Sequence, residues 1–409
     1  MEKHSVIEAS GHKFRTNNIS SRVQKIVISP IKEMSILADE FMEKTGNDVI
    51  SFGQGIPHFD TPEYIKEGII TALKEISTAK YTLEPGMTEL RELIAEFLKS
   101  SRNIKNIDAK KEIMVTAGCQ EAVACSIATV IDEGDEVLLF SPDYASHIEQ
   151  IIQFGGVPIF VSLEEKNGWI LKIKEINQKI TDRTKAIIFS NPSNPTGAVL
   201  TEKEINEIAG VAKKHNLIII ADETYDFLLY DGKKHLSPSS LEDIRDRVIL
   251  CGSFSKKYAL TGYRVGYAFS DSGIIDHMLK VHDAIAICAP AISQKAAISA
   301  LSGSQDSVVN FVEKLTSNRE LMCKKLDEMK NLFEYQKPFG AYYILVKYKI
   351  PEIDSLNLAL KILYEAHVIT IPGIAFGPTG EGHIRFSFAC HPKEIEEGFK
   401  RLKKWADNL

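Results

Sequence analysis

The chain has 409 residues, of which 44% are hydrophobic and 25% are charged, and its formal net charge is −6. This apolar content is enough to bury a core, so the composition excludes a disordered protein, and the length suggests about two or three domains. The acidic balance argues against a nucleic-acid partner, which needs a basic protein surface. No apolar run approaches the roughly 18 residues of a membrane helix, so we expect no membrane partner.

The six cysteines are scattered along the chain and form no CxxC pair. This pattern argues against a disulfide framework and against a structural zinc site, and we expect no bound metal. The N-terminal residues are polar and contain no apolar segment of the signal-peptide type. We therefore expect a cytoplasmic protein.

The first predicted element is a helix over residues 31–44. From residue 112 onward, short runs rich in Val and Ile alternate with helical patterns, which is typical of strands buried on both faces. The predicted strands are 112–116, 136–140, 157–161, 185–190, 217–222, 247–252 and 265–269. The predicted helices between them are 120–131, 147–154 and 202–215, the last with Thr201 and Glu204 as a capping box. The alternation predicts an α/β fold, with helices on both faces of a mostly parallel sheet.

The C-terminal quarter of the chain has a different pattern. It contains one long amphipathic helix over 309–330, strand-like segments at 341–346 and 383–388, and a closing helix over 393–407. This order predicts a smaller α+β domain, which the N-terminal segment joins. We expect residues 1–58 to form an N-terminal arm and part of the small domain, 59–298 the large domain, and 299–409 the rest of the small domain.

The most informative segment is residues 253–266, SFSKKYALTGYRVG, which follows a predicted strand. Its Lys256 amine can form a Schiff base with an aldehyde. The planar fork of Arg264 suits a phosphate, and the hydroxyl of Ser253 adds a donor. A phosphate-bearing aldehyde held by lysine is pyridoxal phosphate (PLP). The alternative interpretation is a solvated loop with ordinary charges, and we expect the neighbouring Lys257 to point into solvent.

This segment resembles the cofactor-attachment site of class I and II aminotransferases, which belong to fold type I. Further motifs match the family in order: FGQGIPHFDTP at 52–62, Tyr81 followed by Pro85 and Gly86, NPSNPTG at 191–197, ADETY at 221–225, and HIRFS at 383–387. The resemblance extends from about residue 25 to the C-terminus. It implies a large PLP-binding domain with a mostly parallel seven-stranded sheet, a smaller α+β domain, and PLP as the cofactor.

The resemblance also implies roles around the cofactor ring. Lys256 would carry PLP as a Schiff base and act as the general acid and base. Asp222 would hold the proton of the ring nitrogen, because it ends an apolar strand where ligands meet an open α/β sheet. Asn194 and Tyr225 would donate to the phenolic oxygen, and Tyr144 would stack on the ring. Without the resemblance, Asp222 could equally cap a turn and Tyr144 could pack on the sheet.

The phosphate would lie at the start of the predicted helix 120–131, where free N–H groups and the helix dipole favour an anion. The resemblance places Gly118 and the N–H groups of Cys119 and Gln120 there, with Ser253 and Arg264 supplying side chains. A glycine before a helix is common in any such turn, so this motif is weak when taken alone.

The remaining implied contacts involve the substrate and a second subunit. Arg385 would bind the substrate α-carboxylate and draw the small domain over the site, with Gly55 and Asn194 contacting the same substrate. Tyr81 would reach the phosphate of the partner subunit in a homodimer with composite active sites. Without the resemblance, Tyr81 would be a surface aromatic and Arg385 a surface charge.

The predicted activity is ping-pong transfer of an amino group between an L-amino acid and a 2-oxo acid. Ile56 offers an apolar wall, and Cys119 stands where some relatives of acidic specificity carry a lysine, so we expect a neutral or aromatic amino acid. The main alternative is a PLP-dependent lyase on the same fold, resembling cysteine-S-conjugate β-lyases or aminocyclopropane-carboxylate synthases. A regulatory module of a transcription factor is disfavoured by the acidic charge.

Overall fold

The computed structural model describes residues 19–26 and 29–408. Its central sheet has seven strands in the order β2-β8-β7-β6-β5-β3-β4. These strands are β2 (Ile113–Thr116), β3 (Glu136–Ser141), β4 (Val157–Ser162), β5 (Thr184–Ser190), β6 (Ile218–Asp222), β7 (Val248–Ser253) and β8 (Gly266–Phe269). All seven predicted strands are confirmed, with ends that differ by no more than about one residue. β8 pairs antiparallel with both of its neighbours, β2 and β7, and the other pairs are parallel, so the sheet is mostly parallel.

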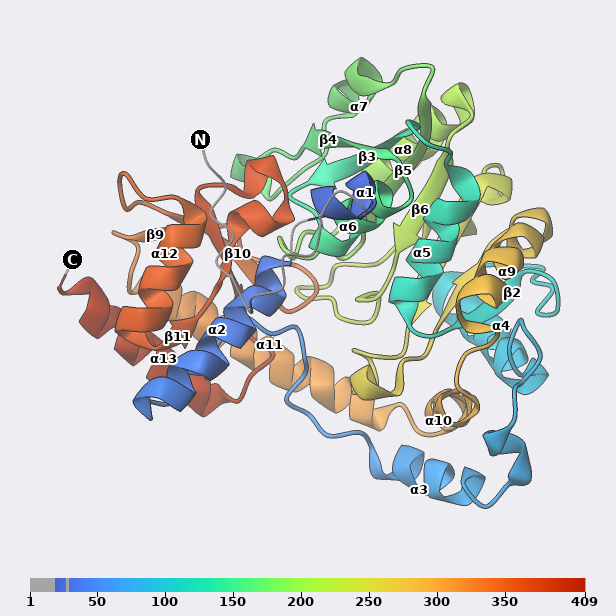
Figure 1. The fold of residues 1–409 in the computed structure, drawn as a ribbon, viewed down its shortest axis with the longest axis horizontal. Coiled ribbons are helices and arrows are strands. Elements are labelled where there is room, and N and C mark those ends of the chain that lie inside the picture. The colour runs from blue at the N-terminus through green and yellow to red at the C-terminus, as the bar shows by residue number, and fades with distance from the viewer. Residues whose placement is uncertain (1–18, 27–28, 409) are drawn as a thin grey trace.

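Helices cover both faces of this sheet, because successive side chains of each strand point to opposite faces. Ile188 and Ile220 pack with residues of α5 (Cys119–Val130), α6 (Ala145–Gln153) and α9 (Ser272–Ala286) on one face. Ile187 and Ile219 pack on the other face with residues of α7 (Ile173–Lys179) and α8 (Glu202–His215). Figure 1 shows the sheet with helices on either side. This double burial explains the continuous Val and Ile runs.

Helix α8 has the predicted capping box. The Thr201 hydroxyl accepts from the Glu204 N–H, and the Glu204 carboxylate accepts from the Thr201 N–H. Several of the described helices had no predicted counterpart, and three of them are α3 (Glu63–Ala72), α4 (Thr88–Arg102) and α10 (Ala291–Ser302). They pack together beside β2 and β8 in one apolar cluster.

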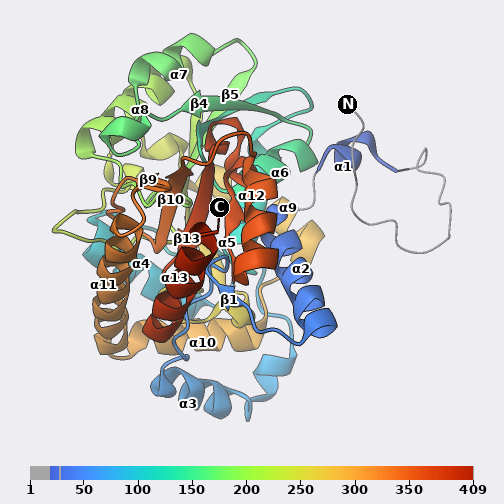
Figure 2. The same ribbon diagram turned by 90° about the vertical axis from the view of Figure 1, so that its left-hand side faces the viewer.

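A second, four-stranded sheet has the order β12-β13-β10-β9 and is antiparallel throughout. Its strands are β9 (Phe333–Tyr335), β10 (Tyr343–Tyr348), β12 (Ile371–Pro372) and β13 (His383–Ser387). Helices α11 (Asp306–Asp327), α12 (Ser355–Lys361) and α13 (Pro392–Ala406) accompany these strands, as Figure 2 shows. The predicted long helix, the closing helix and both strand-like segments are therefore confirmed, with shifted ends.

The N-terminal segment contacts the C-terminal elements. β1 (Ile50–Ser51) pairs in parallel with β11 (Val368–Ile369), and the predicted helix 31–44 is α2 (Pro30–Thr45). A short helix, α1 (Ser21–Lys25), precedes α2. The first 18 residues of the predicted arm lie outside the described residues. Within the described part of the chain, no helix is long and apolar enough to cross a membrane.

Candidate active site

A cavity of about 590 Å³ lies at the carboxyl edge of the seven-stranded sheet. The predicted site residues that line it are Gly55, Cys119, Gln120, Tyr144, Asn194, Asp222, Tyr225, Ser253, Lys256, Arg264 and Arg385. The topology explains this convergence, because the chain leaves β3, β5, β6 and β7 at the same edge. Gly118 borders the cavity, whereas Tyr81 does not line the cavity of its own chain and is 77% exposed.

Lys256 follows β7, which ends at Ser253, and its Nζ donates to the carbonyl oxygen of Gly55 at 2.5 Å. Burial lowers the pKa of Lys256 to about 8, and the positive charges of Arg264 and Arg385 lower it in the same direction. The ordinary lysine pKa is about 10.4, so the neutral amine is roughly two orders of magnitude more abundant here at neutral pH. A neutral amine is the form that attacks an aldehyde.

Asp222 ends β6 and is buried on the floor of the cavity. Its Oδ1 accepts from the backbone N–H of Thr224 at 3.0 Å and from the Cys119 thiol at 3.5 Å, and its Oδ2 lies 3.4 Å from Nε2 of His147. Burial alone would raise the pKa of Asp222, but the contacts with His147 and Thr224 lower it below its ordinary value. The carboxylate therefore stays ionised.

His147 was not among the predicted residues. It lies on α6, and its Nδ1 is 3.2 Å from Oδ2 of Asp143. Burial opposes a charge on this ring, yet the carboxylates of Asp143 and Asp222 raise the pKa of His147 to about 10. His147 is therefore an imidazolium that lies between two buried carboxylates. The four-residue spacing of Asp143 and His147 at a helix start could have indicated their contact. The contact of His147 with Asp222 had no such signal, because Asp222 is remote in the sequence.

The turn before α5 presents free donors to the cavity. Helix α5 has no side-chain cap, and the N–H groups of Cys119 and Gln120 have no acceptor among the described residues. Gly118 has φ of +88°, and a Cβ there would collide with the guanidinium of Arg264, whose Nη1 donates to the Thr261 carbonyl at 3.0 Å. Free N–H groups at a helix start beside an arginine form an anion site.

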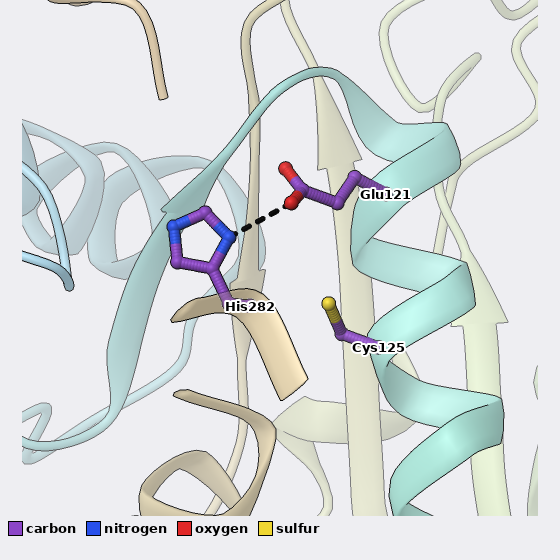
Figure 3. A group of neighbouring side chains, drawn as sticks. All are labelled: Glu121, Cys125 and His282. Carbon is purple, nitrogen blue, oxygen red and sulfur yellow. Dashed lines mark hydrogen bonds and ion pairs between the residues drawn. The ribbon is translucent and has the colours of Figure 1, made fainter. Parts of the chain in front are cut away.

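A buried cluster lies behind this turn (Figure 3). Glu121 accepts from the N–H of Ala117 and lies 2.9 Å from Nδ1 of His282. The potential ligand atoms of Glu121, Cys125 and His282 lie within 4.8 Å of one another. Because the Glu121 carboxylate is already hydrogen-bonded to the backbone of the turn, we interpret the cluster as a brace that connects α9 to the start of α5.

Arg385 reaches the cavity from β13 of the second sheet and is buried. Its Nη1 donates to Oδ1 of Asn194 at 2.9 Å, and its Nη2 donates to the carbonyl oxygen of Gly53 at 2.6 Å. The guanidinium lies 4.3 Å from the ring centre of Tyr343 and 5.0 Å from that of Phe376. These contacts fix the guanidinium beside the Asn194 side chain.

Aromatic side chains complete the cavity. The hydroxyl of Tyr225 lies 2.7 Å from the hydroxyl of Tyr343, and the hydroxyl of Tyr342 donates to the Gly55 carbonyl at 2.7 Å. Tyr144 is half-buried and packs edge-on against His147. No sequence motif pointed to Tyr342 or Tyr343, because their positions depend on how the second sheet packs against the first.

Two neighbours of the predicted residues lie outside the cavity lining. Glu223, beside Asp222, points away from the cavity and contacts His235 at 2.9 Å and Ser237 at 2.5 Å. The expectation for Lys257 was wrong. It is half-buried, and its Nζ lies 4.2 Å from the ring centre of Phe97, so cation–π attraction holds it against the protein.

The unpaired and charged groups of the cavity fit the chemical groups of PLP. The free N–H groups at the start of α5 suit the phosphate, and the weakly basic amine of Lys256 suits the aldehyde. The ionised Asp222 suits a protonated ring nitrogen.

We expect His147→Leu to lower the free energy of unfolding by about 3 kcal/mol, because it removes the cation between two buried carboxylates. The folded-state pKa of about 10 lies above the ordinary 6.5. The stabilisation is therefore complete below pH 6.5 and is lost as the pH rises through 10. Thermal unfolding measured across this range tests the prediction. A difference in Tm between the variant and the wild type that does not shrink at high pH, or an equal loss for His277→Leu at an exposed site, would contradict it.

Comparison with known proteins agrees with this geometry. The model of the family "Aminotransferase class I and II" matches residues 47–402. The chain is 39% identical to an aspartate aminotransferase of Pyrococcus abyssi over 359 residues, which cover 87% of this chain and 91% of the relative. It is 36% identical to aromatic-amino-acid aminotransferase 2 of Thermococcus litoralis, with coverage of 94% and 97%.

A solved structure is similar over nearly its full length. The alanine aminotransferase of Pyrococcus furiosus is 33% identical to this chain with a TM-score of 0.90, and the match covers 96% of this chain and 100% of that one. The chain therefore belongs to the class I and II aminotransferases, which are PLP-dependent enzymes of the transaminase class.

Proposed function

We propose that this cavity catalyses ping-pong transamination between an L-amino acid and a 2-oxo acid. The observation that carries the proposal is the convergence of Lys256, Asp222 and Arg385 on one cavity. They supply an amine for an aldehyde, an anion for a ring nitrogen, and a cation for a substrate carboxylate. A PLP-dependent lyase needs the same three groups, but the names of the relatives favour transamination.

Bound PLP supplies an electron sink for the carbanion that forms when a substrate loses its α-proton. We propose that the N–H groups of Cys119 and Gln120 hold its phosphate, together with Ser253 and Arg264. Gly118 supports this assignment, since any side chain there would displace the Arg264 guanidinium.

Around the ring, each proposed contact has a physical reason. Asp222 holds a proton on the ring nitrogen, and His147 keeps Asp222 ionised. Asn194 and Tyr225 donate to the phenolic oxygen and stabilise its negative charge. Tyr144, which lines the cavity, would pack against the face of the ring and help to hold it in place.

The substrate contacts follow the same logic. Arg385 binds the α-carboxylate with its planar fork, and Asn194 and Gly55 lie beside it. Lys256 would take the α-proton from the substrate and later return it, while the bound cofactor would stabilise the negative charge left on the substrate. Its weakly basic amine suits both transfers, because a proton carrier works best with a pKa near the working pH.

We also propose a homodimer in which Tyr81 of the partner subunit reaches the phosphate. Tyr81 is exposed, and the surrounding segment carries the exposed apolar side chains of Ile70, Leu73, Ile76 and Leu83. Several large exposed apolar side chains on one segment are typical of a protein–protein interface. We also propose the domain division of 1–58, 59–298 and 299–409, which the pairing of β1 with β11 supports. We propose a cytoplasmic location, which the free thiols of the described cysteines support.

The cavity mouth suits two kinds of substrate side chain. Ile31, Ile36 and Ile56 line it and favour a neutral or aromatic amino acid. Lys32 also lines the cavity mouth. The other basic lining residues have a proposed partner on the cofactor or on the substrate α-carboxylate, whereas Lys32 has none. Because a ping-pong enzyme binds two substrates in turn at one site, we propose that Lys32 contacts the second carboxylate of a dicarboxylic partner such as glutamate or 2-oxoglutarate.

The role of Lys256 predicts how the apoprotein takes up PLP. We expect the rate at which the visible absorption band forms to rise with pH, with a midpoint near pH 8, because only the neutral amine reacts. Lys256→Ala should form no band and lose turnover by at least about a thousandfold, whereas Lys257→Ala should form the band. Stopped-flow absorbance measures the rate of band formation, and a steady-state assay measures turnover. Band formation or substantial turnover in Lys256→Ala would overturn the assignment.

The role of Lys32 predicts a selective loss. We expect Lys32→Met to lower kcat/KM for dicarboxylic substrates roughly three- to fivefold, the upper part of the range for one exposed ion pair. The same ratio for an aromatic amino acid should change less than about twofold. Lys44→Met, on the same helix but outside the cavity, is the matched control. Equal losses for both substrate classes would reject this subsite.

A further inference from the structure

Tyr225 and Tyr343 form a hydrogen bond between two hydroxyl groups 2.7 Å apart. Tyr225 follows β6 of the large sheet, whereas Tyr343 begins β10 of the second sheet, and both side chains are buried. Each hydroxyl has one hydrogen to donate. The direction of this bond therefore decides whether the Tyr225 hydrogen remains available to a bound ligand.

The surroundings hold Tyr343 in one position. Its ring lies 4.3 Å from the guanidinium carbon of Arg385. The chain approaches so closely at Gly55 that a Cβ there would overlap the Tyr343 hydroxyl. The hydroxyl therefore lies in contact with both the Gly55 backbone and Tyr225.

Two features favour Tyr343 as the donor. Donation places additional negative charge on the donor oxygen, and the Arg385 cation beside the Tyr343 ring stabilises that charge. If Tyr225 donated to Tyr343, it would present only lone pairs to a phenolate, which needs a donor.

We propose that Tyr343 is a positioning residue: it donates its hydroxyl hydrogen to the oxygen of Tyr225 and leaves the Tyr225 hydrogen for the phenolic oxygen of the cofactor. This inference rests on the proposed function, in which Tyr225 contacts that oxygen. Accepting a hydrogen bond polarises the Tyr225 O–H and makes it a stronger donor. A stronger donor stabilises the phenolate and thereby makes the neighbouring lysine–cofactor nitrogen less basic.

The test is a pH titration of the visible absorption of the PLP-loaded protein. Tyr343→Phe removes the hydroxyl but keeps the ring beside Arg385. We expect the pKa of the lysine–cofactor nitrogen to rise by about 0.3 to 1 pH unit, the scale of one hydrogen bond. No shift, or a fall, would overturn the proposal, because a fall is expected if Tyr225 were the donor in the wild type.

Two further variants separate positioning from a general structural effect. If Tyr343 acts through Tyr225, the shift caused by Tyr343→Phe should vanish in a Tyr225→Phe background, and full additivity would contradict the proposal. Tyr230→Phe is the matched control. Tyr230 is a buried tyrosine outside the cavity, with Arg319 4.4 Å from its ring centre and its hydroxyl bonded to the Ala341 carbonyl at 2.8 Å. An equal shift in Tyr230→Phe would also overturn the proposal.

The measurement distinguishes this inference from the proposed function. A wild-type protein with no titrating visible band after addition of PLP would contradict the proposed function itself. A titrating wild type with an unshifted Tyr343→Phe would contradict only the role of Tyr343. If Tyr343→Phe does not fold, 3-fluorotyrosine at position 343 retains the volume and is a stronger donor. The pKa should then fall, and a rise would overturn the proposal.

Discussion

The cavity depends on a carboxylate that must stay ionised where burial disfavours charge. Asp222 is buried at the end of β6, and the imidazolium of His147, held in turn by Asp143, supplies the opposing charge. Removing one partner of a buried pair leaves an uncompensated charge and costs about 3–5 kcal/mol. In the proposed function a protonated ring nitrogen adds a second cation, so two cations face two carboxylates. Arg385 reaches the same cavity from the second sheet.

Much of the fold was predictable because local patterns and burial agree. The apolar run ending at Asp222 fits a strand covered on both faces, and the capping box of Thr201 and Glu204 marks the start of α8. The helices α3, α4 and α10 had no predicted counterpart. Their apolar faces pack mainly on one another and on β2 and β8, so their burial depends on tertiary contacts that a local pattern does not contain.

The candidate site also contains residues that were predictable from the sequence and residues that were not. The meeting of Asp222 and Lys256 in one cavity was predictable, because parallel topology brings the ends of β6 and β7 to one edge of the sheet. His147 was missed because one of its two carboxylate partners lies on another strand. Tyr343 was missed because its role depends on how the second sheet packs. Lys257 was placed wrongly because sequence shows its charge but not the Phe97 ring beside it.

The most direct test of the central claim is a half-reaction with a single substrate. One L-amino acid at a time is added to the PLP-loaded protein without any oxo acid, and the visible absorption is followed while products are identified. We expect an effective amino acid to remove the visible band with release of its 2-oxo acid, and a second 2-oxo acid to restore the band. A persistent band with accumulation of pyruvate and ammonia, or of carbon dioxide, would contradict it and indicate elimination or decarboxylation.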